Sequence, residues 1–305
     1  MFPIIPAASA ADSGNQEGLF GFGYDQYSTY GVTAVTNLVS DTGVVATDTA
    51  GVGTARHSQG ACEYGGDKGI FAYGYTNQVV SMSNLVSNAG VVATDVTGVG
   101  QSRYQTAGCS YGEDKGIFGY GHRSGAGGLA TWALTNLVSN VGVVGTDVTG
   151  VGTARRQLAA CEYGDDKGIF GFGTTGSRVG MTNLVSNAGV VATDVTAVGT
   201  AKQGPAACRY GSDKGIFGYG DDGSATADTN LVSNVGVISS DVTGVGSARS
   251  NLAATQYGGD KGIFGFGYLS GMVSMTNLVS NAGVVATDVT GVGTIRYNPA
   301  ACSFN

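Results

Sequence analysis

The sequence has little charge and no long apolar run. Charged residues make up 12% of the chain, against the roughly 25% that is usual for a soluble domain. The net charge of −7 and the lack of a basic patch argue against DNA, RNA and anionic membranes as partners. No run reaches the ~18 apolar residues of a membrane helix, so we expect no membrane insertion.

Catalytic and metal-binding residues are also scarce. The two histidines, His57 and His122, occupy different parts of the chain, so their spacing provides no histidine-based triad and no histidine-rich zinc site. Carboxylate pairs of the kind that hydrolyse glycosides remain open, because a fold can bring distant loops together. Nearly every aspartate, however, occupies a repeated position, which indicates scaffolding. We therefore expect a protein that is not an enzyme and needs no metal or cofactor.

Proline is rare, with 4 residues against 54 glycines, which places the glycines in turns and close contacts. Two of the prolines lie in the first six residues, which lack a basic segment and make a poor signal peptide. Residues 1–15 are therefore predicted to form an arm or tail, and residues 16–305 a single domain.

What the sequence has in abundance is repetition. Four short runs accompany the tetrapeptide Asn-Leu-Val-Ser in a constant order, so the repeating object is a supersecondary unit. A unit of this size cannot bury its own faces and must stack against copies of itself. The tetrapeptide occurs 47 residues apart, with one interval of 52, beginning at Asn37, Asn84, Asn136, Asn183, Asn230 and Asn277.

The five cysteines all occupy one position of this repeat, where Thr255 replaces a sixth. Equivalent positions in neighbouring units generally lie beyond the ~7 Å limit on the Cα separation of a disulfide. We expect small buried thiols rather than disulfides or metal ligands. The residues are Cys62, Cys109, Cys161, Cys208 and Cys302.

Each unit reads as four strands. In the second unit, small residues lead to Cys62, and a turn follows before Ile70–Gly74, where a period of two separates the aromatic residues from the small ones. A variable segment then leads to Ser83–Ser87, and a turn precedes the β-branched run Val91–Thr94. Four strands in roughly 47 residues, repeated six times, predict a six-bladed β-propeller with four-stranded antiparallel blades.

The two ends of the chain favour a closed ring over an open solenoid. The first unit lacks the arginine-to-cysteine strand, and the last unit ends with it, at residues 295–304. The C-terminal strand can therefore pair with the N-terminal blade and remove the open edges. A solenoid would instead need polar capping repeats, and neither end is atypical in that way.

The order of arginine-led strand, turn, aromatic strand, variable loop and two further strands resembles the kelch-type propeller. This resemblance implies that Gly60-Ala61-Cys62 and its copies lie innermost and line a central channel. The chain departs from the kelch pattern in two ways, because Gly218-Tyr219-Gly220 and its copies replace a double glycine and the fourth-strand tryptophan is absent.

A second resemblance concerns the sequence motifs of the repeats. Asp-Lys-Gly-Ile-Phe-Gly-Tyr-Gly, followed by Thr-Asn-Leu-Val-Ser-Asn-x-Gly-Val-Val, is similar to repeat proteins of bacteriophage and environmental viral origin. These motifs recur over nearly the whole chain.

Charged residues should form rings, because they recur. One interpretation is a symmetric electrostatic surface that binds an anion or a partner on the axis. The other is structural: the aspartates shape turns and the basic residues join adjacent blades. The basic ring is Arg56, Arg103, Arg155, Lys202, Arg249 and Arg296, and the acidic ring is Asp48, Asp95, Asp147, Asp194, Asp241 and Asp288.

The segments between the aromatic strand and Asn-Leu-Val-Ser vary from unit to unit and should emerge on one face, where recognition residues are displayed. The third is the longest and carries His122, Arg123 and Trp132, the chain's one tryptophan. Trp132 either contacts a partner or covers the apolar end of its own blade. Asp25, Tyr27 and Tyr30 in the first segment are weaker candidates.

These features predict a structural, docking or attachment protein, a component of a phage or virus particle, whose partners are other protein subunits. Outside a particle, the chain would be cytoplasmic. The alternative is a carbohydrate-binding, lectin-type propeller, which predicts similar aromatic and amide pockets between several blades. An enzyme such as a glycosidase is a third, weaker hypothesis.

Overall fold

The computed structural model describes residues 16–123, 130–196 and 198–304. The expected arm at residues 1–15 lies outside these ranges. Within them the chain forms antiparallel β-sheets and one short 3-10 turn, η1 (Thr29–Gly31), and no α-helix. The described residues contain no helix that is long and apolar enough to span a membrane. The prediction of an all-β chain built from small antiparallel sheets is confirmed.

Six sheets share one order of strands from the inside to the outside. Sheets 1 to 3 consist of β21 (Ala300–Phe304), β1 (Glu17–Gly23) and β2 (Thr33–Val39); β3 (Gly60–Tyr64), β4 (Lys68–Ala72) and β5 (Ser83–Val86); and β6 (Ala107–Tyr111), β7 (Lys115–Gly119) and β10 (Thr135–Val138). Sheets 4 to 6 consist of β11 (Ala159–Tyr163), β12 (Lys167–Gly171), β13 (Met181–Val185) and β14 (Val195–Thr196); β15 (Ala206–Tyr210), β16 (Lys214–Asp221) and β17 (Ala225–Val232); and β18 (Ala253–Tyr257), β19 (Lys261–Gly265) and β20 (Thr276–Val279). A separate pair consists of β8 (His122–Arg123) and β9 (Ala130–Thr131).

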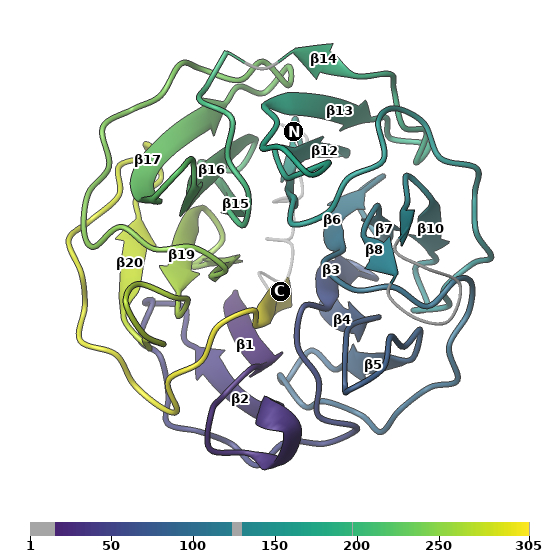
Figure 1. Ribbon diagram of the computed structural model, residues 1–305, viewed down its shortest axis with the longest axis vertical. Helices are drawn as coiled ribbons and strands as arrows, with labels where there is room; N and C mark the ends of the chain where they lie inside the picture. The colour runs from purple at the N-terminus through teal and green to yellow at the C-terminus, as the bar shows by residue number, and fades with distance from the viewer. Residues whose placement is uncertain (1–15, 124–129, 197, 305) are drawn as a thin grey trace, which may run out of the picture.

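The sheets are arranged around a common centre, with their inner strands next to it (Figure 1). The inner strands contact one another in a cyclic order, β3, β6, β11, β15, β18, β21 and again β3. Each middle strand therefore lies between neighbouring sheets and buries both of its faces. In β4, for example, Ile70 and Phe71 point to opposite faces and both have 0% exposure.

In five of the six inner strands, a cysteine packs against a glycine of the next middle strand; in β18, Thr255 takes this place and packs against Gly18. A Cβ atom at Gly116 would collide with Sγ of Cys62, and one at Gly168 would collide with Sγ of Cys109. The glycine therefore allows the close approach of two sheets, and the cysteine fills the space between them. All five cysteines are free and buried, as the sequence predicts.

Among the described residues, a fourth strand occurs only in sheet 4, where the two-residue β14 pairs with β13. It lies after the run equivalent to Val91–Thr94, so the predicted fourth strand is complete in no sheet. The outer segments are instead joined by isolated bridges, such as Val39 to Val45 and Thr36 to Thr49 in sheet 1. An asparagine amide adds a side-chain bond to this segment in every sheet, as Asn37 does by donating a 3.0 Å hydrogen bond to the carbonyl oxygen of Ala46.

A continuous circle of backbone hydrogen bonds surrounds the centre. Six residues, one from the segment before each inner strand, have φ angles of 51° to 61°. Each donates its N–H to the carbonyl oxygen of the equivalent residue in a neighbouring unit, over 2.7–3.3 Å. The left-handed conformation is uncommon for residues with a side chain. Five such residues adopt it here, and all five make the hydrogen bonds of the circle. The six residues are Ser58, Gln105, Gln157, Gly204, Asn251 and Asn298.

The two ends of the chain meet in sheet 1. The last strand, β21, pairs with β1 from Glu17 opposite Phe304 to Gly21 opposite Ala300. Sheet 1 thus takes its inner strand from the C-terminus, as the sequence predicts.

Deleting residues 295–305 tests the importance of this pairing. The deletion removes β21 and Arg296 and leaves β1 with an unpaired edge, so we expect a loss comparable with the whole stability of a domain, about 5 kcal/mol or more. Thermal unfolding followed by circular dichroism measures the effect. A chain without residues 1–15 is the control for truncation as such. If the chain without residues 295–305 melts at the same temperature as the full chain, the closure does not stabilise the fold.

Candidate functional site

The six repeated basic residues are buried in the joints between sheets. Each cation lies over an aromatic ring of the preceding sheet; in one joint, Cζ of Arg249 is 4.4 Å from the centroid of the Tyr219 ring. The N–H of Gly220, next to that ring, donates a 2.9 Å hydrogen bond to the Arg249 carbonyl oxygen. The basic side chains, all with 0% exposure, are Arg56, Arg103, Arg155, Lys202, Arg249 and Arg296.

The same cation also holds its own sheet together. Nη2 of Arg249 donates to Oδ1 of Asn277 over 2.7 Å, and its Nε donates to the carbonyl oxygen of Phe266 over 2.9 Å. Asn277 begins one copy of Asn-Leu-Val-Ser, and its amide donates in turn to Oδ1 of Asp288 over 2.9 Å. In four of the six joints, the asparagine of the repeat is therefore a link between the buried cation and the acidic ring.

The acidic residues complete these joints at the outer side. Asp288 accepts hydrogen bonds from the N–H and the hydroxyl of Ser247 at the start of the segment that enters its sheet. Burial alone would raise the pKa of this carboxyl, but the bonds from Ser247 and Asn277 and the charge of Arg249 lower it. Its equivalents in the ring, each next to the cation of its own joint, are Asp48, Asp95, Asp147, Asp194 and Asp241.

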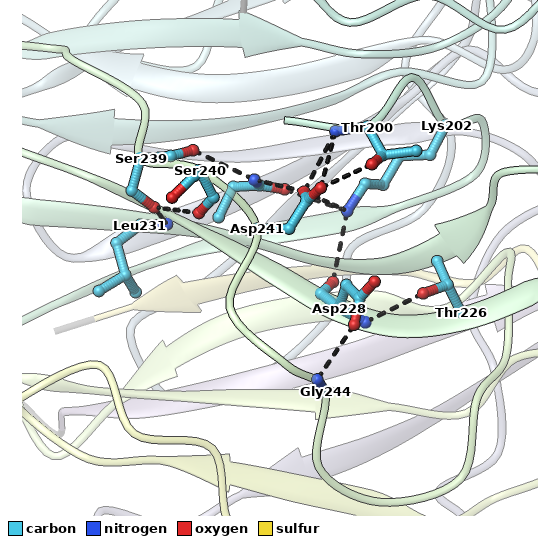
Figure 2. A network of polar contacts seen from close by, with 10 residues as sticks. Thr200, Lys202, Thr226, Asp228, Leu231, Ser239, Ser240, Asp241 and Gly244 are labelled. Atoms are coloured by element: carbon cyan, nitrogen blue, oxygen red, sulfur yellow. Dashed lines mark hydrogen bonds and ion pairs between the residues drawn. The ribbon is translucent and has the colours of Figure 1, made fainter. Parts of the chain in front are cut away.

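One joint has a lysine in place of arginine, and Figure 2 shows its contacts. Nζ of Lys202 donates to Oδ1 of Asn230 over 3.0 Å and lies 3.4 Å from the carbonyl oxygen of Asp228. It is 5.2 Å from the centroid of the Phe172 ring, whereas the arginine Cζ atoms lie 3.9–4.4 Å from theirs. Lys202 therefore fills the same position with one hydrogen bond fewer than Arg249 makes.

The candidates of the first variable segment lie in different environments. Asp25 is buried, and its carboxylate accepts hydrogen bonds from the N–H groups of Tyr27 and Ser28 over 2.8 and 2.7 Å. It thus shapes its own loop. Tyr27 and Tyr30 are 73% and 75% exposed, so they are open to a partner.

The candidates of the third variable segment lie on or beside the β8–β9 hairpin. His122 is buried, while Arg123 and Trp132 are partly buried. The N–H of Trp132 donates to the carbonyl oxygen of Gly121, and its indole Nε1 is buried without a partner among the described residues. Residues 124–129 of this segment lie outside the described ranges.

A row of aromatic rings, which the sequence reasoning missed, extends over this face. Neighbouring rings have centroids 5.0–5.7 Å apart, and the row crosses from sheet 6 through sheets 1 and 2 to sheet 3. We call it the aromatic arc, and its members in spatial order are Tyr268, Tyr297, Tyr24, His57, Tyr75, Tyr104 and His122.

The arc combines two positions of the repeat. One follows the buried cation, as in His57 and Tyr104, and the other begins the variable segment, as in Tyr75 and His122; backbone bridges join His57 to Tyr75 and Tyr104 to His122. In sheets 4 and 5 the same positions are polar. The sequence signal was therefore variation directly after the repeated basic residue. Its meaning depends on which residues are neighbours in space.

The arc borders a small central cavity of about 70 Å³ that residues from all six units line. Gln59 and Thr106 are 4% and 7% exposed and line it. Oε1 of Gln59 and Oγ1 of Thr106 have no hydrogen-bond partner among the described residues. Buried polar atoms normally have a partner, so these two oxygens are exceptions among the described residues.

The opposite end of the centre has a different chemistry. The inner-strand position before the final aromatic residue carries an irregular set of polar side chains. Nη1 of Arg209 lies 3.2 Å from Oε2 of Glu162, and the hydroxyl of Ser303 donates to Oε2 of Glu63 over 2.9 Å. Burial, together with the charge of Glu162, raises the pKa of Glu63 to about 7. The full set is Glu63, Ser110, Glu162, Arg209, Gln256 and Ser303.

Within the described ranges, no three side chains of histidine, cysteine, aspartate or glutamate are grouped so that they could hold a metal ion. The comparisons with protein-family models and with curated proteins find no match for this chain.

Exchanging the cations of two joints tests how they stabilise the fold. Arg249→Lys loses the hydrogen bond from Nε to Phe266, so we expect a destabilisation of about 1–3 kcal/mol. The reverse exchange, Lys202→Arg, supplies the missing donors and should be neutral or stabilise by up to about 1 kcal/mol. Urea denaturation measures both. Equal effects of the two exchanges would show that the guanidinium geometry is unimportant.

The substitution Glu63→Gln tests the buried carboxyl at the opposite end. The folded-state pKa of about 7 exceeds the ordinary 4.5, so the folded protein favours the protonated carboxyl. The wild-type protein should therefore lose stability as the pH rises from about 4.5 to 7. We expect the free energy of unfolding of the variant to equal that of the wild type near pH 4 and to exceed it by up to about 3 kcal/mol at pH 8. Urea denaturation at both pH values measures this, and a constant difference would contradict it.

Proposed function

We propose that the six sheets are the blades of a kelch-like six-bladed β-propeller, and that the protein is a non-enzymatic structural, docking or attachment subunit of a phage or virus particle. The cyclic contacts of the inner strands, the circle of backbone hydrogen bonds and the pairing of β21 with β1 support the propeller. A rigid scaffold of this kind displays the variable segments on one face.

The observation that carries the structural role is a belt of exposed valines on the outer segments. At one position of every unit a valine is 63–65% exposed. A second position adds valines that are 45–49% exposed in five of the units. Scattered apolar residues are normal on a surface, but a belt that recurs in every sheet indicates contact with other protein. The first set is Val44, Val91, Val143, Val190, Val237 and Val284.

The outer segments also lack the features that protect free edges. Natural sheet edges are commonly blunted by lysine, proline or charges that oppose pairing with another chain. The outer segments, from 44–54 to 284–295, contain no lysine, arginine or proline, and each has one acidic residue, which is engaged in a joint. Edges of this kind are suited to burial against neighbouring subunits.

The distribution of the charged residues supports a non-enzymatic role. The repeated aspartates and basic residues are occupied in the joints, and the two histidines belong to the aromatic arc, where Tyr75 and Tyr104 separate them. Neither set is arranged as an acid–base pair around the central cavity.

Replacing the six valines of the first set by lysine tests the structural role. We expect the wild-type chain to form assemblies larger than a monomer and the lysine variant to remain monomeric, because six charges would oppose burial of the rim. Light scattering after size exclusion, with electron microscopy, measures the state. The melting temperature of the lysine variant should differ little from that of the wild type, since the six positions are exposed.

The matched control replaces the same valines by threonine, which keeps their shape without adding charge. A wild-type chain that is monomeric both in its native source and at high concentration would contradict the proposal. Assembly of the lysine variant to the same extent would show that the belt is not the contact surface.

A further inference from the structure

The central cavity and the aromatic arc are neighbours in the fold. His57, Tyr104 and Tyr297 of the arc directly precede Ser58, Gln105 and Asn298, which line the cavity. The side chains of Gln157 and Asn251 line it as well. Aromatic rings and amide side chains thus occur near each other, on a surface different from the valine belt.

We propose that the aromatic arc and the cavity that it borders bind a neutral oligosaccharide. Sugar hydroxyls donate and accept hydrogen bonds, so they match the amide side chains of Gln157, Asn251 and Asn298, which line the cavity. The C–H faces of a sugar pack against flat aromatic rings, and sites that combine aromatic walls with a few polar groups are typical of small-ligand binding.

The cavity volume decides how the ligand lies. At about 70 Å³, the cavity is small beside the roughly 300–1,000 Å³ of typical small-ligand pockets. A sugar ring therefore lies across the arc and inserts a hydroxyl or hydroxymethyl group.

The charges on this face favour a neutral ligand. None of the seven arc residues carries a charge at neutral pH, because burial lowers the pKa of both histidines, that of His57 to about 4. On the polar side of the face, Arg178 forms a 2.8 Å ion pair with Asp221, so its charge is compensated. Two further cations, Arg123 on β8 and Arg156, lie at the His122 end of the arc, whereas the cations that precede His57, Tyr104 and Tyr297 in the chain are buried in the joints.

The length of the arc indicates an oligosaccharide rather than a single sugar. Seven rings with neighbouring centroids 5.0–5.7 Å apart span parts of four sheets. Several adjoining rings can contact successive sugars of one chain. The joints of sheets 6, 1, 2 and 3 thus offer similar aromatic positions, as expected of a carbohydrate-binding propeller.

The test begins with the full-length chain on an array of neutral glucose, galactose, mannose, fucose and N-acetylglucosamine oligosaccharides, with sialylated and sulfated glycans for comparison. Titration calorimetry then measures the best neutral binder. We expect binding to at least one neutral oligosaccharide and a tenfold or larger loss of affinity in Tyr75→Ala and Tyr297→Ala. The matched control is Val141→Thr, at a position that is 70% exposed and lies outside the arc and the belt; it should bind as the wild type does.

Because Tyr75 and Tyr297 are partly buried, their replacement by alanine risks misfolding. Two further measurements do not depend on these variants. Tyr268→Ala truncates the exposed end of the arc, and saturation-transfer difference NMR on the unaltered chain identifies the sugar protons in contact. We expect weaker binding in the variant and the strongest signals from C–H protons. Binding to no neutral glycan, binding restricted to charged glycans, or wild-type affinity in all three arc variants would overturn the proposal. A protein ligand would give the first of these results.

These outcomes are independent of the assembly state. Loss of glycan binding leaves the role of the valine belt intact, and a monomeric chain could still bind a glycan through the arc.

Discussion

The structure depends on a buried cation at every joint between sheets. Each guanidinium, or the ammonium of Lys202, lies over an aromatic ring of the preceding sheet and donates to an asparagine or backbone carbonyl of its own sheet or entering segment. A charge without exposure is stable only when such partners surround it. Because every joint uses the same arrangement, the aspartate, asparagine, aromatic residue and cation of a repeat cannot change independently.

This constraint explains the unusual surface. The charges that a soluble domain normally places outside are used here between the sheets, so the outer segments keep exposed valines and a single engaged aspartate. Constant joints also leave variation to the positions that no joint uses. These positions meet at the two ends of the centre, one lined by aromatic rings and amides, the other by Glu63, Glu162 and Arg209.

The two ends and the rim therefore differ in chemistry although the sheets are alike. The rim repeats the same apolar side chain in every unit, which suits contact with identical or similar neighbours. The aromatic arc covers only part of its face and has polar residues in the remaining sheets, which suits one asymmetric ligand. A repeated scaffold can thus combine a symmetric contact surface with an asymmetric site.

The sequence by itself determined the all-β repeat, its strand order, the free buried cysteines and the pairing of the last strand with the first, because each follows from a local pattern that recurs. Only the tertiary structure decided where the charges lie: the basic and acidic rings are one network, since Asn277 joins Arg249 to Asp288 across residues distant in the chain. It also showed that isolated bridges replace most of the predicted fourth strand and that Asp25 is buried. The arc was beyond sequence reasoning, because its rings come from two repeat positions that approach only when neighbouring segments pair.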